Sequence, residues 1–149
     1  MVDDKKIITA VRDSWSWSGI DPVEIIARNE FANLILKDAD DRYWRLCPED
    51  LYCDVVAQND AEFDQLFKDE EFLEDWHMHV LVRLAKQEIG TLAEGQKYCF
   101  ITPGVLGGEY AVSNIKTAPI TEIIGMSGDI AKQIKDLPDG TKIRLTVKH

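Results

Sequence analysis

The segment Lys97–Ile115, KYCFITPGVLGGEYAVSNI, decides how the second half of this 149-residue chain folds. It opens with a short aromatic and β-branched run, passes through Pro103 to the adjacent pair Gly107 and Gly108, and resumes as Glu109–Val112. Two neighbouring glycines between such runs supply positive φ angles and let the backbone approach another group closely. The segment therefore predicts a strand, a tight structural turn at Gly107 and Gly108, and a second strand.

Glu109 and Tyr110 come directly after this turn. A carboxylate beside a tight turn can accept hydrogen bonds from free backbone N–H groups, or it can face a binding partner. Residue chemistry alone favours an ordinary hairpin with a solvated acid. Both residues are nevertheless candidates for contact with a partner.

The same segment resembles a known family. An aromatic residue followed by Cys and Phe, then a proline, Leu-Gly-Gly-Glu-Tyr and Asn-Ile, is similar to the signature of bacterial proteins long classed as a domain of unknown function. The likeness extends from Tyr43–Asp50, YWRLCPED, to Asp139–Gly140. That family is associated with the C-terminal domain of immunity proteins against type VI secretion DNase effectors. The resemblance implies a protein that binds and neutralises a cognate toxin and has no enzymatic activity.

Length and composition predict one soluble domain spanning residues 1–149. Hydrophobic residues make up 45% and charged residues 30%, and no stretch approaches the roughly 20 apolar residues of a membrane span. The N-terminal sequence MVDDKK has no apolar core of a signal peptide, so we expect a cytoplasmic protein. The odd number of cysteines, Cys47, Cys53 and Cys99, fits reduced core thiols better than a disulfide framework.

The chain is strongly acidic, with a formal net charge of −10 from 17 basic and 27 acidic residues. Such a field repels phosphate backbones, and no basic patch is visible in the sequence, so we expect no direct binding of nucleic acid. A basic protein partner is the natural complement, although solubility alone also explains many acidic proteins.

The first half of the chain predicts an amphipathic helix and an antiparallel meander. Apolar residues recur at helical spacing within residues 3–15, namely Ile7, Ile8, Val11 and Trp15. The β-prone runs that follow are Val23–Ala27, Leu34–Lys37 and Tyr43–Leu46, with Tyr52–Ala57 either a fourth strand or an extended crossover. The run Tyr43–Leu46 alternates as a strand with one buried face would.

Two central helices are predicted next. Asn59 and Glu62 have the spacing of a capping box, and residues 69–71 can end the first helix and cap the second. Gly90 is placed as the left-handed cap of the second helix. The residues predicted to make that helix the main core helix are Leu73, Trp76, Val80, Leu81 and Leu84.

The last part of the chain predicts a helix and a strand. Apolar positions from Ile123 to Ile134 are interrupted by Gly125 and Gly128, which predicts a kinked helix or a short one beginning near Ser127. Residues 138–140 form a turn signal, and residues 143–147 alternate as a final strand. The predicted fold class is α+β: a single domain whose mainly antiparallel sheet packs against a central pair of helices, with further helices at both termini.

No sequence motif indicates catalysis. The chain has no Gly-x-Ser-x-Gly elbow, phosphate loop or dinucleotide fingerprint. His77 and His79 lie two residues apart on a predicted helix, about 200° apart around its axis, which places them too far apart to bind one metal. We therefore predict no catalytic residue, no cofactor and no metal site. The tryptophans Trp15, Trp17, Trp44 and Trp76 could suggest a ligand cage, but three of the four fall on predicted amphipathic elements and are better assigned to the core.

The sequence predicts a partner-binding surface on the acidic outer side of the central helices. Between residues 60 and 75, eight acids stand against the single base Lys68, a local charge of −7. The other interpretation is a solvated helix face, which charge runs usually form. The candidate partner-binding residues are Asp60, Glu62, Asp64, Asp69, Glu70, Glu71, Glu74 and Asp75, together with Glu109 and Tyr110.

Three functions stay open from the sequence. Resemblance and charge together favour an immunity protein that neutralises a secreted toxin, a type VI nuclease effector with a basic surface. The second is a small ligand-binding or enzymatic domain with a pocket near Glu109. The third is a structural module that self-associates through an exposed strand, since the sequence does not set the oligomeric state.

Overall fold

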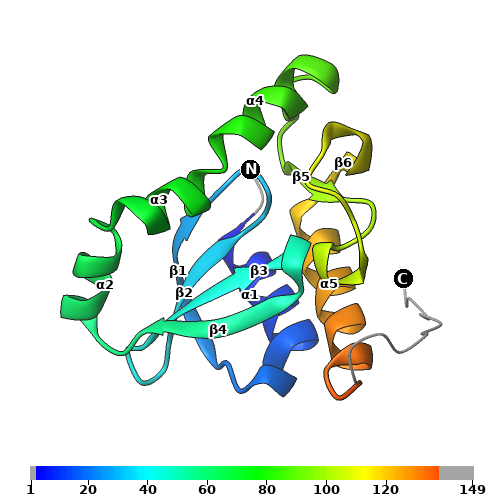
Figure 1. Ribbon diagram of the computed structural model, residues 1–149. Coiled ribbons are helices and arrows are strands. Elements are labelled where there is room, and N and C mark those ends of the chain that lie inside the picture. Colours follow the sequence, from blue (N-terminus) through cyan, green and yellow to red (C-terminus); the bar gives the residue numbers. More distant parts are fainter. Residues whose placement is uncertain (1–2, 138–149) are drawn as a thin grey trace.

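The computed structural model describes residues 3–137, and its centre is a four-stranded antiparallel sheet. The strands follow one another in sequence order, so the sheet is the predicted meander (Figure 1). Its strands are β1 (Pro22–Arg28), β2 (Leu34–Asp38), β3 (Tyr43–Cys47) and β4 (Tyr52–Ala57). The segment that the sequence left open between strand and crossover is therefore the fourth strand, and the predicted α+β class is confirmed.

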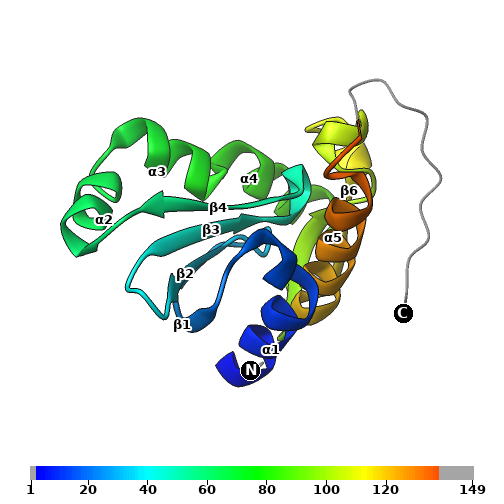
Figure 2. The same ribbon diagram turned by 90° about the horizontal axis from the view of Figure 1, so that it is seen from below.

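Helices cover both faces of this sheet, as Figure 2 shows. On one face lie α1 (Asp4–Trp15) and α5 (Ile120–Ile134). Alternate residues of the sheet meet these two helices in the largest hydrophobic core. Its fully buried side chains include Ile7, Val11 and Trp15 of α1, Leu34, Leu36 and Leu46 of the sheet, and Ile124 of α5.

The helix α5 runs without interruption from Ile120 to Ile134, so the predicted late start near Ser127 is wrong, whereas the alternative of a kink stays a prediction. Gly128 serves packing against α1. A Cβ atom at Gly128 would lie 2.5 Å from the carbonyl oxygen of Ser14. Gly128 therefore lets the two helices approach more closely than a side chain would allow, at the cost of its weak helix propensity.

On the other face of the sheet lie α2 (Asp60–Leu66), α3 (Glu70–His77) and α4 (His79–Glu88). α2 and α3 contact the sheet through aromatic side chains, whereas Val82 and Ala85 of α4 pack in a separate core with Tyr98 and Phe100. The rings of Tyr43 and Phe63 stack with centroids 4.1 Å apart. Further ring contacts extend this cluster through Phe67 and Phe72 to Trp76, which is 3% exposed.

The predicted second central helix is two helices, and it is not the main core helix. The helix is interrupted at Met78, whose φ of 50° lies in the left-handed region and ends α3. This break changes the helical phase. Val82 and Ala85 are consequently buried, whereas Val80 of the predicted stripe is 60% exposed.

The predicted helix caps are confirmed. The side chain of Asn59 accepts a hydrogen bond from the Glu62 amide at 2.9 Å, and the Glu62 carboxylate accepts from the Gln58 amide at 2.9 Å. Asp69 caps α3 by accepting from the Phe72 amide at 3.0 Å. Gly90 has a φ of 113° just after α4. These caps hold three short helices that lie across the sheet.

All five residues of β3 are buried, which contradicts the predicted single buried face. The reason is that helices cover both sides of the strand. Three of the four tryptophans are buried as predicted, and Trp17 is half-buried against the ring of Trp15, with centroids 5.5 Å apart. The three cysteines are free thiols, and Cys47 and Cys53 are buried.

A second, two-stranded sheet replaces the predicted hairpin around the glycine pair. It consists of β5 (Gln96–Phe100) and β6 (Ile115–Pro119), paired antiparallel. The first predicted strand is thus confirmed, but residues 109–112 are not the second one. Residues 101–114 form a long loop with two short 3-10 turns, because Asn114 and the glycines tie this segment to itself rather than to β5.

The predicted turn at residues 138–140 and the predicted strand at residues 143–147 lie outside the described residues. Within residues 3–137, no helix has the length and apolar character needed to cross a membrane.

Candidate functional site

The loop of residues 101–114 is held in one conformation by Asn114. Its side-chain oxygen accepts a hydrogen bond from the Thr102 amide, and its side-chain nitrogen donates to the carbonyl oxygens of Thr102 and Glu109, each at 2.9 Å. Three hydrogen bonds of one buried side chain thus fasten the two ends and the middle of the loop. No local pattern in the sequence indicates this role of Asn114.

The glycine pair is required in this loop for two separate reasons. Gly107 has a φ of 93°, in the left-handed region, and open space surrounds the position of a Cβ atom. At Gly108 a Cβ atom would lie 1.8 Å from the carbonyl oxygen of Thr102. The predicted structural turn is therefore present, with the unusual dihedral at the first glycine and the close approach at the second.

Tyr110 joins the loop to the turn that follows β3. Its hydroxyl donates a hydrogen bond to the carboxylate of Asp50, and its ring meets the edge of Phe100 at a centroid distance of 4.8 Å. Burial, reinforced by the Asp50 carboxylate, raises the pKa of the Tyr110 phenol. The neutral hydroxyl is thus kept as a donor, while 52% of the residue stays exposed.

The loop also presents apolar side chains to solvent. Ile101 is 57% and Val105 is 59% exposed, so with Tyr110 three large hydrophobic residues gather on one short segment. Beside them a small groove of about 80 Å³ runs along α5. Its lining is mostly apolar and includes Phe100, Ile101, Pro103, Ile123, Met126 and Ile130. Such a groove is suited to an aliphatic or aromatic side chain. Glu109 is exposed and is not part of its lining.

Four of the eight predicted acidic residues make hydrogen bonds or ion pairs within the molecule. Glu62 and Asp69 cap helices, as described above. Asp60 accepts a hydrogen bond from the Tyr43 hydroxyl at 2.7 Å and lies 3.4 Å from the Lys37 ammonium. Asp75 accepts from the buried guanidinium of Arg45 at 2.5 Å. The contacts of these four acids stabilise the fold, and they account for the four residues without a binding partner.

The other four acids, Asp64, Glu70, Glu71 and Glu74, have no side-chain partner within residues 3–137. All four are exposed on α2 and α3. We call this group the acidic face. Like charges placed this close oppose helix formation by a few tenths of a kcal/mol per pair. Glu70 and Glu71 lie in the first turn of α3, where the helix dipole favours acidic side chains, whereas no ion pair in the described part of the chain compensates Asp64 and Glu74.

A buried polar network connects Asp75 to the loop side of the sheet. Arg45, 4% exposed, donates from Nε and Nη2 to the side-chain oxygen of Asn33 at 3.1 and 3.0 Å. Asn33 in turn donates to both oxygens of Glu49 at 2.8 Å, and the Cys47 thiol donates to Glu49 at 2.8 Å. The sequence offered one signal that was missed, a charged residue in the middle of the apolar run YWRLC.

Glu49 and Cys47 titrate outside their usual ranges because they are buried. Burial raises the pKa of Glu49, and the hydrogen bonds from Cys47 and Asn33 oppose this rise only in part. Burial also raises the pKa of the Cys47 thiol, and the neighbouring Glu49 carboxylate raises it further. Cys47 is accordingly held as a thiol, which is neither a nucleophile nor a good metal ligand.

Within residues 3–137, the group nearest to a metal-ligand set is Cys47, Glu49 and Asp50, whose ligand atoms lie within 4.8 Å of one another. The protonated thiol and the internal hydrogen bonds fit this group poorly to an ion. The histidine prediction needs a correction. His77 and His79 do not share one helix, because the chain breaks at Met78, and their rings stack with centroids 5.0 Å apart.

Comparison with known proteins identifies one family. The model of the type VI secretion system (T6SS) immunity protein Tdi1, C-terminal, matches residues 57–131, which is half of the chain. The matched range contains α2 to α4, the loop of residues 101–114 and most of α5. It includes the motif LGGEY, whereas YWRLCPED lies before it. No curated protein matched the chain.

Proposed function

This chain belongs to the family of the T6SS immunity protein Tdi1, C-terminal, and we propose that it protects its cell by binding a cognate nuclease effector and blocking its activity. Membership of an immunity family supports an immunity role, in which the chain acts by binding rather than by catalysis. We propose two further points: that the partner is a nuclease, and which surface of this chain binds it.

The acidic face is the observation that carries the proposal. Asp64, Glu70, Glu71 and Glu74 are exposed and have no side-chain partner among residues 3–137, and they lie inside the family match. A nuclease needs a basic surface to bind the DNA backbone. An acidic inhibitor can cover that surface, and opposite charges accelerate their encounter by roughly 10- to 1,000-fold.

The loop of residues 101–114 supplies a second kind of contact. Asn114, Gly108 and the bond from Tyr110 to Asp50 fix its conformation before any partner binds. Exposed apolar side chains on such a preformed loop are presented at little entropic cost. We propose that Ile101, Val105 and Tyr110 form the apolar part of the interface, next to charged contacts that steer association.

The experiment tests whether this chain protects cells against the effector encoded by the neighbouring gene. The effector is expressed in a bacterial host from an inducible promoter, with and without this chain, and plasmid integrity and survival are measured. We expect plasmid degradation and death without the chain, and intact plasmid and growth with it. Killing that leaves plasmid intact, yet is relieved by the chain, would keep the immunity role and refute the nuclease. No relief of killing would refute the proposed function.

The small ligand-binding or enzymatic domain considered from the sequence gains no support from these contacts. Glu109 lies outside the apolar groove, so it does not combine with it into a ligand site. Cys99 and Ser127 line the groove, but burial raises the pKa of the Cys99 thiol and the Ser127 hydroxyl donates to the Ile124 carbonyl oxygen, so neither is activated by a base.

A further inference from the structure

The outward side of α4 carries a row of basic residues that the sequence analysis did not identify. His79, Arg83 and Lys86 follow one another at spacings of four and three residues, which places them on the same side of the helix. With Val82 and Gln87 they line a shallow, open surface depression. We call these three residues the basic stripe.

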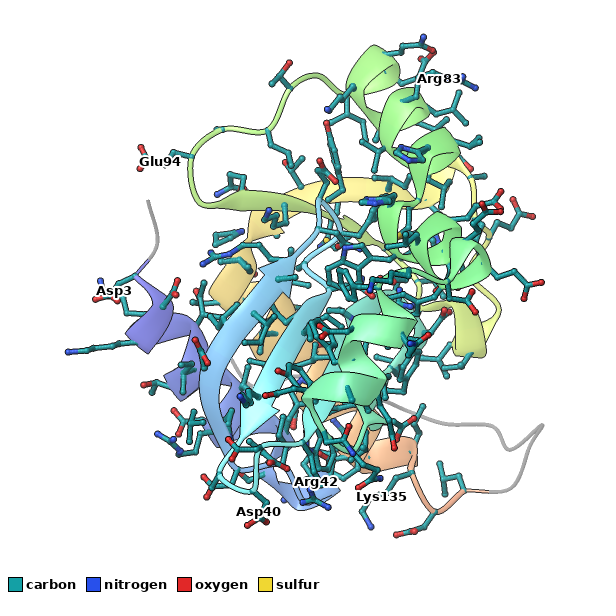
Figure 3. All side chains as sticks on the ribbon, turned by 90° about the vertical axis from the view of Figure 1, so that its left-hand side faces the viewer. Asp3, Asp40, Arg42, Arg83, Glu94 and Lys135 are labelled. Atoms are coloured by element: carbon teal, nitrogen blue, oxygen red, sulfur yellow. The ribbon has the colours of Figure 1, made fainter. Side chains whose placement is uncertain are left out.

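The basic stripe is unpaired in the described part of the chain. None of the ion pairs among residues 3–137 includes Arg83 or Lys86. Figure 3 shows Arg83 projecting from α4 away from the four-stranded sheet. In a chain with a net charge of −10, two free cations on one side of one helix form a local field of the opposite sign.

The break at Met78 places this stripe next to the acidic face. α3 carries Glu70, Glu71 and Glu74 and ends at His77, and α4 begins at His79. Both helices lie on the same face of the sheet (Figure 2). The outer surface of the three short helices is therefore bipolar, acidic over α2 and α3 and basic over α4. The exposed Val80 lies at the junction.

We propose that the basic stripe of α4 binds an acidic patch of the nuclease effector, beside the basic patch that meets the acidic face. This inference rests on the proposed function and adds the charge pattern of the partner. A metal-dependent nuclease offers this pattern, because the carboxylates that hold its divalent ions lie next to the basic surface that holds DNA. A bipolar surface also fixes orientation, since a reversed complex would bring like charges together.

The test compares two variants of equal charge in binding to the purified, catalytically inactivated effector. Arg83→Glu with Lys86→Glu reverses the stripe, and Lys5→Glu with Lys6→Glu makes the same change on α1, at the opposite face of the sheet. All four residues are exposed, and glutamate is a good helix former, so both variants keep the fold. Melting curves check that they do.

We expect the α4 variant to bind at least tenfold more weakly than the α1 variant at low salt, and the difference to shrink at high salt. Equal affinities for the two variants would overturn the proposal, because only net charge would then matter. A wild-type chain that binds a short DNA duplex by itself, through Arg83 and Lys86, would also overturn it. If the wild-type chain does not bind the effector at all, the proposed function fails, and the inference fails with it.

Discussion

Arg45, in the centre of β3, donates a hydrogen bond to Asp75 on α3, which packs on this face of the sheet. The Arg45 Nη1 atom lies 2.5 Å from the Asp75 carboxylate. The guanidinium also lies 5.4 Å from the ring centroid of Trp76 and 5.7 Å from that of Phe72. One buried cation therefore fastens the acidic helix to the sheet. Asp75, although 70% exposed, belongs to the fold rather than to the acidic face.

Replacing the two partners should consequently have unequal effects on stability. Arg45→Met leaves the buried side-chain oxygen of Asn33 without two of its donors, and we expect a loss of about 2–4 kcal/mol in the free energy of unfolding. Asp75→Asn leaves Arg45 bonded to Asn33 and stacked on the two rings, so about 1 kcal/mol or less should be lost. Urea unfolding curves measure both. Equal losses would show that Asn33 and the rings contribute nothing to holding Arg45.

Substitutions at Gly107 and Gly108 should also have unequal effects on stability. Gly108→Ala forces a Cβ atom against the Thr102 carbonyl oxygen, which requires the backbone to move, and we expect it to be the more damaging substitution. Gly107→Ala meets no atom and carries only the left-handed penalty of about 1–2 kcal/mol. The double valine variant should melt well below the parent chain. Thermal melting followed by circular dichroism provides the measurement, and a parental melting temperature for Gly108→Ala would contradict it.

Alanine substitutions at the two glycines of α5 should change stability in opposite directions. Gly128→Ala clashes with Ser14 of α1 and should destabilise by about 1–3 kcal/mol. At Gly125 the nearest atom to a Cβ would be the Ser14 hydroxyl oxygen, 3.7 Å away, which is an ordinary contact. Gly125→Ala should therefore gain up to about 1 kcal/mol from helix propensity. The prediction fails if both substitutions shift the melting temperature in the same direction.

How far the sequence predicts this fold depends on whether the signal is local. The first three strands of the meander, the caps at Asn59 and Asp69, and the positive φ of Gly107 rest on neighbouring residues, and they were predicted correctly. The continuity of α5 depends on α1, more than a hundred residues earlier, which no local pattern reveals. The break at Met78 was missed for a different reason, because methionine is a good helix former and gives no stop signal.

The sequence predicts where acidic residues are concentrated, but it does not predict which of them make contacts within the fold. Counting charges found the acidic segment, but only contacts separate Asp75, which binds Arg45, from Glu74, which has no partner in the described residues. The basic stripe was missed because two bases in α4 are inconspicuous until the helix places them side by side. Tyr110 was singled out as a candidate contact, but its bond to Asp50 was not predictable because it joins residues sixty positions apart.

Burial of Glu49 should make stability depend on pH. Its pKa is raised above the ordinary value of 4.5 in the folded protein, so the folded state holds the proton more tightly than the unfolded chain. The stabilising contribution is complete below pH 4.5 and is lost as the pH rises through the raised pKa. Glu49→Gln cannot titrate and serves as the reference. We expect the wild-type chain to lose stability relative to this variant as the pH rises from 4, measured by urea unfolding. Parallel pH profiles would show that the carboxylate is not protonated in this range.

The acidic face can be tested apart from the fold because its residues have no internal partners in residues 3–137. Reversing Asp64, Glu70, Glu71 and Glu74 to lysine leaves the contacts of Arg45 and the helix caps in place. We expect association with the effector to slow at least tenfold at low salt, the lower end of the range for electrostatic steering. Stopped-flow measurement of the association rate over a series of salt concentrations gives the size of this effect.

A matched control separates local charge from net charge in that experiment. It reverses four exposed acids elsewhere that also lack partners in the described chain, Asp13, Asp21, Glu24 and Asp54. Each reversal adds two positive charges, so both variants have the same net charge, and only the position of the change differs. Steering by the acidic face requires the α2–α3 variant to associate more slowly than the control. If the two rates are equal, or if the α2–α3 variant protects cells as well as the parent, the acidic face is only solvated. The contact would then have to be made by the loop that carries Ile101, Val105 and Tyr110.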